Sequence, residues 1–231
     1  MFCNRFKNYV KIKICFNLRI LLVIFNVLCY LKDRRKIMNI GIDLDGVTFD
    51  TENWLRTFAE IYDVEIGKPG VVDAEEFLVQ NRMGWSEEEY RDFVGKYAMY
   101  IEKNTPLMPG IKVVLDKLRD MGHRLIVITA RGDWGPMEED ITEEILEQHD
   151  VKFDKICYMC KDKLSKCQEE EIDYMIDDSF KHVERLSQAG INCLYFRDVG
   201  RKKVENEHVI EAANWGDIYR FFYNLNKKDR I

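Results

Sequence analysis

Short runs of apolar, mostly β-branched residues alternate along the chain with longer stretches whose apolar residues recur at helical spacing. Such short runs are typical of strands, and strands separated by helices are typical of a parallel sheet with crossover connections. The pattern therefore predicts a doubly wound parallel α/β sheet. Its predicted strands cover residues 39–43, 123–130, 155–159, 173–177 and 191–196.

The segment 109–122 illustrates the helical pattern. Ile111, Val114, Leu115 and Leu118 fall at i, i+3, i+4 and i+7, which places them on one face of a helix. Gly122 follows as a residue that commonly ends helices. We expect this helix to lead directly into the strand 123–130.

Between the first two predicted strands, residues 51–105 show helical spacing and no convincing strand, with a break at 67–70 (GKPG). We expect a small helical cap at 51–105, inserted into an α/β core made of residues 38–50 and 106–231. Three aromatic residues of this segment are expected to form part of the core of the cap: Trp54, Trp85 and Tyr90.

The N-terminal segment 1–37 differs from the rest because it is basic, with nine Lys and Arg residues against one acidic residue. It contains an apolar tract at 14–31 that approaches the length of a membrane span but is interrupted by Asn17, Arg19 and Asn26. Two interpretations stay open. The segment is either a membrane anchor or an over-extended reading frame before a start at Met38, in which case a cytoplasmic protein is expected.

Composition supports a globular protein, because 46% of the residues are hydrophobic and 12% aromatic. Residues 38–231 hold 26 basic and 40 acidic residues, which argues against duplex nucleic acid as a partner. A small anion held by a metal ion remains compatible with this charge.

The seven cysteines are an odd number without regular spacing, which favours a reducing compartment over a disulfide framework. Cys157 and Cys160 have CxxC spacing, but a zinc site needs four ligands and only Cys167 is near, so buried or helix-edge thiols are expected. The histidines follow no metal-binding spacing and are expected at the surface or in caps: His123, His149, His182 and His208.

Polar residues gather where the predicted strands end, the edge at which open parallel sheets bind ligands. They are Asp43 and Asp45 after the first strand, Thr129 and Arg131 after the second, Lys163 after the third, and Asp177 and Asp178 at the end of the fourth. Four carboxylates at one edge repel each other unless a hard cation lies among them, and Mg²⁺ suits carboxylates combined with a phosphate oxygen.

Four motifs in this order are DLDGV (43–47), VITAR (127–131), DKLSK (162–166) and MIDDS (175–179). Together they resemble the motifs of the haloacid dehalogenase superfamily of phosphohydrolases. The resemblance covers most of residues 39–225, and this part of the chain resembles the bacterial 5′-nucleotidase-type branch, which has a small helical cap between the first two motifs.

The resemblance implies that Asp43 is a nucleophile that forms an aspartyl phosphate, a covalent route open to carboxylates. Asp45 would be the general acid and then the general base, and its backbone carbonyl would bind the metal. The family's dehalogenases lack this second acid, so Asp45 favours phosphoryl transfer. Gly46 would let the chain turn sharply beside the phosphate.

By the same resemblance, Thr129 would donate its hydroxyl to the phosphoryl group and Lys163 would neutralise charge on the phosphate and Asp43. Lys161 and Lys166 are nearby alternatives to Lys163.

Asp177 and Asp178 would complete the magnesium site, and the sequence leaves open which of them binds the ion directly. Arg131 would contact the substrate or pair with an acidic residue of the cap.

Each motif alone has a simpler interpretation. A DxD sequence is usually a solvated turn, and the pair Asp177 and Asp178 before Ser179 is typical of a helix N-terminus. Taken together, the motifs predict a Mg²⁺-dependent phosphomonoesterase acting on a small phosphorylated substrate, such as a nucleoside monophosphate or another phosphometabolite. The alternatives are a non-catalytic module that binds phosphate or metal and a membrane-tethered factor defined by residues 1–37.

Overall fold

The computed structural model describes residues 37–132, 136–196 and 202–228. Residues 37–223 form one compact unit. The possible anchor in segment 1–37 falls almost entirely outside the described residues. No helix in the described ranges combines the length and apolar character needed to cross a membrane.

The unit is built on a six-stranded parallel sheet with the strand order β3-β2-β1-β4-β5-β6. The strands are β1 (Asn39–Ile42), β2 (Arg124–Ile128), β3 (Lys155–Cys157), β4 (Tyr174–Asp177), β5 (Asn192–Phe196) and β6 (Val209–Ala212). The predicted doubly wound sheet is confirmed. Because the order reverses between β1 and β4, a crevice is expected at the carboxyl ends of these two strands.

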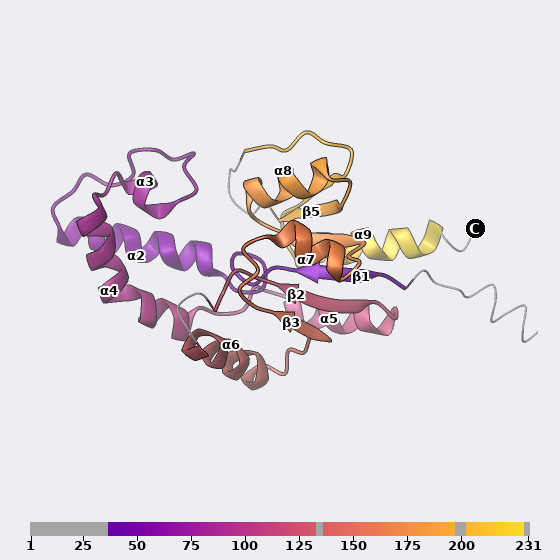
Figure 1. The fold of residues 1–231 in the computed structure, drawn as a ribbon. Coiled ribbons are helices and arrows are strands. Elements are labelled where there is room, and N and C mark those ends of the chain that lie inside the picture. The colour runs from indigo at the N-terminus through magenta and orange to yellow at the C-terminus, as the bar shows by residue number, and fades with distance from the viewer. Residues whose placement is uncertain (1–36, 133–135, 197–201, 229–231) are drawn as a thin grey trace, which may run out of the picture. The chain divides into compact units, whose positions relative to one another are not determined.

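Helices cover both faces of the sheet. They are α2 (Thr51–Glu65), α3 (Val79–Met83), α4 (Glu87–Asn104), α5 (Ile111–Asp120), α6 (Pro136–Gln148), α7 (Lys163–Glu169), α8 (Phe180–Gln188) and α9 (Trp215–Lys228). Figure 1 shows α7 and α8 on one side of the sheet and α5 on the other. The four predicted apolar residues of α5 are all buried, which confirms the helical face proposed for segment 109–122.

The segment between β1 and α5, residues 51–105, contains α2, α3 and α4, here called the helical insertion. Its own apolar cluster includes Tyr62, Trp85 and Phe93, with Trp54 and Tyr90 partly buried against it. A capping box in which Ser86 and Glu89 exchange hydrogen bonds starts α4. In Figure 1 the insertion, coloured indigo to magenta, projects beyond the end of the sheet where β1 finishes.

Asp63 is a fully buried carboxylate that ties the insertion together. Its oxygens accept hydrogen bonds from the Trp85 indole at 2.8 Å and from the backbone N–H of Gly70 at 2.7 Å. A buried charge is tolerated when donors of this kind satisfy it.

We expect Trp85→Phe to lower the free energy of unfolding by about 1–3 kcal/mol, because it leaves an oxygen of Asp63 without its indole donor. Urea denaturation of the purified protein measures this loss. Trp54→Phe is the matched control, since Trp54 is only partly buried at the edge of the same cluster. An equal loss in both variants would show that ring volume, and not the hydrogen bond to Asp63, stabilises the insertion.

Several cysteines and one histidine of the α/β core are buried. Cys157, Cys160 and Cys167 are buried thiols, as predicted. The prediction for His123 was wrong, because its ring is only 3% exposed and its Nδ1 accepts a hydrogen bond from the Met38 backbone N–H at 3.4 Å. The residue precedes β2 and lies next to the start of β1, a position that the pairing of β1 with β2 determines.

Candidate active site

The carboxyl ends of β1 and β4 bring three aspartates together. Asp43 follows β1 directly, and its backbone N–H donates to the Ile176 carbonyl of β4 at 3.0 Å. Asp177 is the last residue of β4 and Asp178 follows it. All three side chains are buried, and one carboxylate oxygen from each lies within 4.8 Å of the other two.

Lys163 is the cation of this acidic cluster. It is the first residue of α7, and its Nζ donates to Asp43 at 2.5 Å and to Asp177 at 2.8 Å. Of the three lysines considered from the sequence, it is the one placed among the aspartates. Lys166 instead pairs with Glu169 at the helix surface.

The electrostatics of the cluster follow from burial and charge. Burial raises the pKa of Asp43 to about 7, with Lys163 opposing the rise and Asp177 adding to it. Burial alone would lower the pKa of Lys163, but Asp177 and Asp43 raise it above its usual range, so the lysine stays protonated. One lysine among three carboxylates leaves a negative site, and clustered carboxylate oxygens are the ligands that Mg²⁺ prefers. The residues present therefore fit a magnesium ion.

Asp45 lies beside this cluster with its side chain turned toward Arg131. The guanidinium donates to both carboxylate oxygens, at 3.0 and 2.7 Å, and the Thr51 hydroxyl donates at 2.8 Å. Burial acts to raise the pKa of Asp45, but Arg131 and Thr51 together lower it below its usual value. Its carboxylate is not among the three that could share an ion, so a metal contact of Asp45 would fall to its backbone carbonyl, as the resemblance implies.

Arg131 joins the end of β2 to the helical insertion. Besides Asp45, it donates to the carboxylate of Glu102 on α4 at 2.5 Å and to the Thr142 hydroxyl on α6 at 3.0 Å. The guanidinium also lies 4.7 Å from the Phe49 ring centre. Of the two contacts considered for Arg131, the structure shows the pair with an acidic residue of the insertion.

Glu102 and Thr51 were not singled out from the sequence, although both contact the pair formed by Asp45 and Arg131. Burial raises the pKa of Glu102 to about 7, with Arg131 opposing this shift and Asp45 adding to it. Only the position of Glu102 near the end of an amphipathic helix marked it in the sequence, a signal shared by many solvated acids. Its contact depends on how the insertion packs.

Thr129 is buried at the end of β2, and its hydroxyl oxygen accepts a hydrogen bond from the backbone N–H of Arg131 at 3.2 Å. This contact fixes the hydroxyl next to the strand ends. Ser179 occupies the N-cap position of α8 without a capping bond from its side chain, and its backbone N–H donates to Asp177 at 2.8 Å. Asp177 therefore combines a helix-terminus contact with its place in the cluster.

Gly46 lets the turn after β1 pass close to Asp178. Its φ is +68°, and a Cβ at this position would lie 2.0 Å from an Asp178 carboxylate oxygen. We therefore expect Gly46→Ala to lower the free energy of unfolding by about 2–4 kcal/mol, through backbone strain and forced movement of Asp178. Chemical denaturation measures the loss of stability. Magnesium titration of the folded variant measures how the movement of Asp178 changes the affinity for the ion.

Gly67→Ala is the control for Gly46→Ala. Its φ is +74°, but nothing lies within 4 Å of an added Cβ, so it carries the backbone strain alone. We expect a loss of about 1–2 kcal/mol with unchanged magnesium affinity. Equal behaviour of the two variants would contradict close packing of Gly46 on Asp178.

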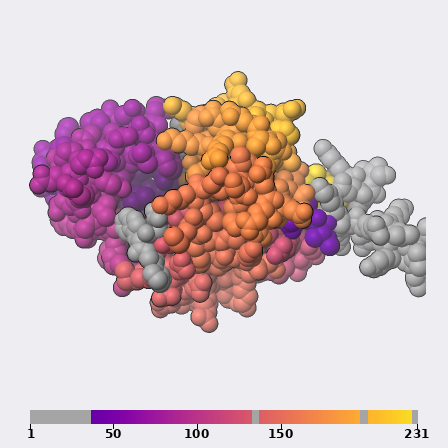
Figure 2. Space-filling view, in the orientation of Figure 1, coloured from indigo at the N-terminus to yellow at the C-terminus, as the bar shows by residue number. Residues whose placement is uncertain are grey.

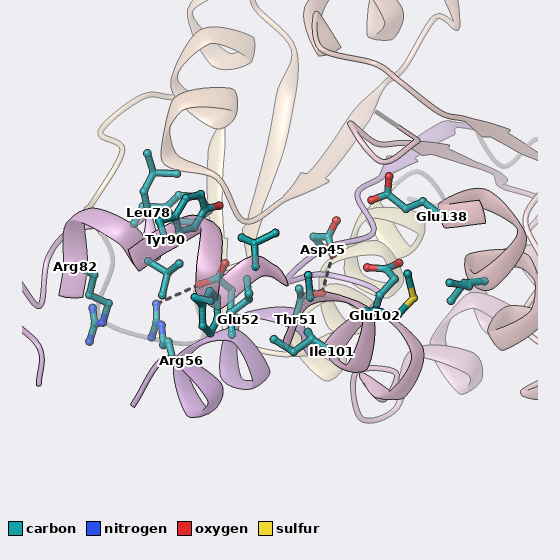
Figure 3. Close-up of a pocket in the computed structure, with 18 of the residues that line it drawn as sticks. Asp45, Thr51, Glu52, Arg56, Leu78, Arg82, Tyr90, Ile101, Glu102 and Glu138 are labelled. Carbon is teal, nitrogen blue, oxygen red and sulfur yellow. Dashed lines mark hydrogen bonds and ion pairs between the residues drawn. The ribbon is translucent and has the colours of Figure 1, made fainter. Parts of the chain in front are cut away.

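A cavity of about 340 Å³ opens beside Asp45, between the helical insertion and α6. Figure 3 shows Asp45, Glu102 and Glu138 at one end of it and Arg56 and Arg82 at the other. A second hollow lies where residues 73–78 face Ser179–His182, and Figure 2 shows the surface indented where the insertion meets the C-terminal half of the unit.

No protein-family model matches the chain, and no curated protein matches it. Solved structures do match the chain. One is a haloacid dehalogenase-like hydrolase from Streptococcus pneumoniae, with 18% identity, a TM-score of 0.58, and coverage of 80% of this chain and 98% of that one.

Two further structures have the same fold. A haloacid dehalogenase-like protein of unknown function from Agrobacterium tumefaciens is 15% identical over 82% of this chain and 99% of its own, with a TM-score of 0.59. A predicted phosphoglycolate phosphatase from Haemophilus somnus is 15% identical over 80% and 98%, with a TM-score of 0.55. At this identity the similarities establish the haloacid dehalogenase-like fold.

Proposed function

We propose that the protein is a Mg²⁺-dependent phosphomonoester hydrolase of the haloacid dehalogenase superfamily, with nucleoside 5′-monophosphates as its first candidate substrates. One observation carries the proposal: Asp43, Asp177, Asp178 and Lys163 meet at the point where the strand order reverses. A predicted phosphatase from Clostridium acetobutylicum with this fold (TM-score 0.54) adds support.

In the proposed first step, a carboxylate oxygen of Asp43 attacks phosphorus and the bond from phosphorus to the ester oxygen breaks. Asp45 gives a proton to the leaving alcohol. In the second step, Asp45 takes a proton from water while the water oxygen attacks phosphorus, which releases inorganic phosphate and restores Asp43.

The other residues stabilise charge in both steps. Lys163 already contacts Asp43 and would offset the charge that develops on the phosphoryl oxygens, and Thr129 would donate its hydroxyl to one of them. Asp43, Asp177 and Asp178 would hold Mg²⁺, which supplies positive charge that offsets the negative charge of the phosphate. The helical insertion would act as a cap over the leaving group, because the cavity beside Asp45 lies between it and the core.

Phosphate release from a panel of nucleoside monophosphates and sugar phosphates, with and without Mg²⁺, tests this function. We expect turnover that depends on Mg²⁺ and is lost on chelation. Mg²⁺ should also stabilise the fold, by about 2.7 kcal/mol at 100 times its Kd. Stabilisation by Mg²⁺ without turnover of any ester would favour the non-catalytic module instead.

A further inference from the structure

The cavity beside Asp45 has a mainly apolar wall. Residues from α2, the segment before α3, α4 and α6 all contribute to it, among them Leu55, Phe77, Leu78, Val94, Met99 and Met137. Sites for small organic ligands are typically lined in this way, with a few polar groups that orient the ligand.

Several of these apolar side chains are exposed although they line a concave surface. Phe77 is 41% exposed, Leu78 52%, Met99 43% and Met137 55%. Large apolar side chains gathered at one exposed hollow indicate a surface that binds an apolar partner. Because Asp45 lines the same cavity, a ligand bound there would also reach the proposed general acid.

The charges of the cavity exclude some leaving groups. The end near the aspartate cluster carries Asp45, Glu102 and Glu138, and the nearby Arg131 already binds Asp45 and Glu102. A leaving group with a carboxylate close to its phosphate would meet these acids. A polyhydroxylated chain would in turn place hydroxyls against the apolar wall, where they lack partners.

The end of the cavity away from Asp45 carries two arginines. Arg56 and Arg82 lie there, away from Asp45, as Figure 3 shows. Arg56 pairs with Glu52 at 3.4 Å, and Arg82 donates to the Ala74 carbonyl at 2.6 Å. The apolar surface thus lies between two polar ends.

Resting on the proposed hydrolase activity, we infer that the cavity selects phosphate monoesters whose alcohol has an apolar or aromatic body. A volume of about 340 Å³ accommodates a ring system. A nucleoside meets the description through its base. Small acids such as glycolate, and open-chain polyols, do not.

Two phosphate esters with the same atoms around the ester oxygen test the inference. In benzyl phosphate and ethyl phosphate the ester oxygen is bound to a CH₂ group, so the two differ in apolar body and little in leaving-group chemistry. We expect kcat/KM to be about tenfold or more higher for benzyl phosphate, from burial of the ring. Glycerol phosphate and phosphoglycolate should fall at or below ethyl phosphate.

A pair of variants locates the effect in the cavity. Met99→Gln should reduce the advantage of benzyl over ethyl phosphate several-fold through KM. Ile61→Gln is the control, because Ile61 lies on α2 with the same 43% exposure but does not line the cavity. An equal benzyl preference in wild type and Met99→Gln would overturn the assignment to this wall.

Binding of the non-hydrolysable benzylphosphonate and ethylphosphonate, measured by calorimetry with Mg²⁺, separates this inference from the proposed function. Tighter binding of benzylphosphonate without turnover of any ester would support the apolar subsite and contradict the hydrolase. Turnover of both esters with equal affinity for the two phosphonates would support the hydrolase and overturn the inference.

Discussion

Replacement of Asp43 by asparagine is expected to abolish phosphate release while the protein stays folded. The amide cannot form the proposed acyl phosphate, and loss of a covalent nucleophile typically costs about 10⁴-fold or more in kcat. The fold should tolerate the change because two of the three buried carboxylates remain and Lys163 keeps its contact with one of them, Asp177. Phosphate release and thermal unfolding of the same preparation measure the two outcomes.

Asp116→Asn provides the matched control for Asp43→Asn. It is the same chemical change at a half-exposed position on α5, where Asp116 pairs with Lys112. We expect full activity from this variant. Normal turnover by Asp43→Asn would end the assignment of the nucleophile, whereas an unfolded Asp43→Asn protein would show that the carboxylate is needed for structure.

The meeting of the aspartates was predictable from the sequence because it depends only on topology. Residues after β1 and at the end of β4 must lie together once these strands are adjacent and parallel. Lys163 starts the helix that leads into β4, and the family resemblance favoured it over Lys161 and Lys166. These positions follow from where elements begin and end, which apolar periodicity indicates well.

Contacts between the insertion and the core could not be predicted in this way. Whether Glu102 reaches Arg131 depends on the rotation and tilt of α4, which helical periodicity does not fix. The burial of His123, which precedes β2, likewise depends on which strand pairs with β2. The weakly apolar strand β6 was missed because one acidic residue, Glu211, interrupts its short run.

The pair formed by Asp45 and Arg131 has a consequence for the proposed mechanism. With its pKa lowered by Arg131, Asp45 is a carboxylate here, which is the form a general base needs. To act as an acid in the first step, it must take up a proton, and this requires the contact with Arg131 to weaken. Since Arg131 also binds Glu102 of the insertion, movement of the insertion offers a way to change that contact.

Asp45→Asn should therefore impair both chemical steps, each by about 10²–10⁴-fold with an alkyl phosphate. With p-nitrophenyl phosphate the two steps separate, because nitrophenolate leaves without needing a proton. We expect a burst of about one nitrophenolate per active site, followed by slow turnover as the phosphoenzyme waits for water activation. Rapid-mixing absorbance measures the burst, and mass spectrometry locates the phosphoryl group on Asp43.

Two comparisons make the burst diagnostic. Asp43→Asn should show no burst with p-nitrophenyl phosphate, because it has no oxygen to receive the phosphoryl group. The wild type should turn over steadily, since Asp45 activates water in every cycle. Because asparagine keeps the shape of Asp45, and Arg131 retains Glu102 and Thr142, misfolding is not expected to explain a slow second step. Steady turnover of Asp45→Asn at the wild-type rate would instead mean that another group activates water, and Glu102 would then be the next residue to replace.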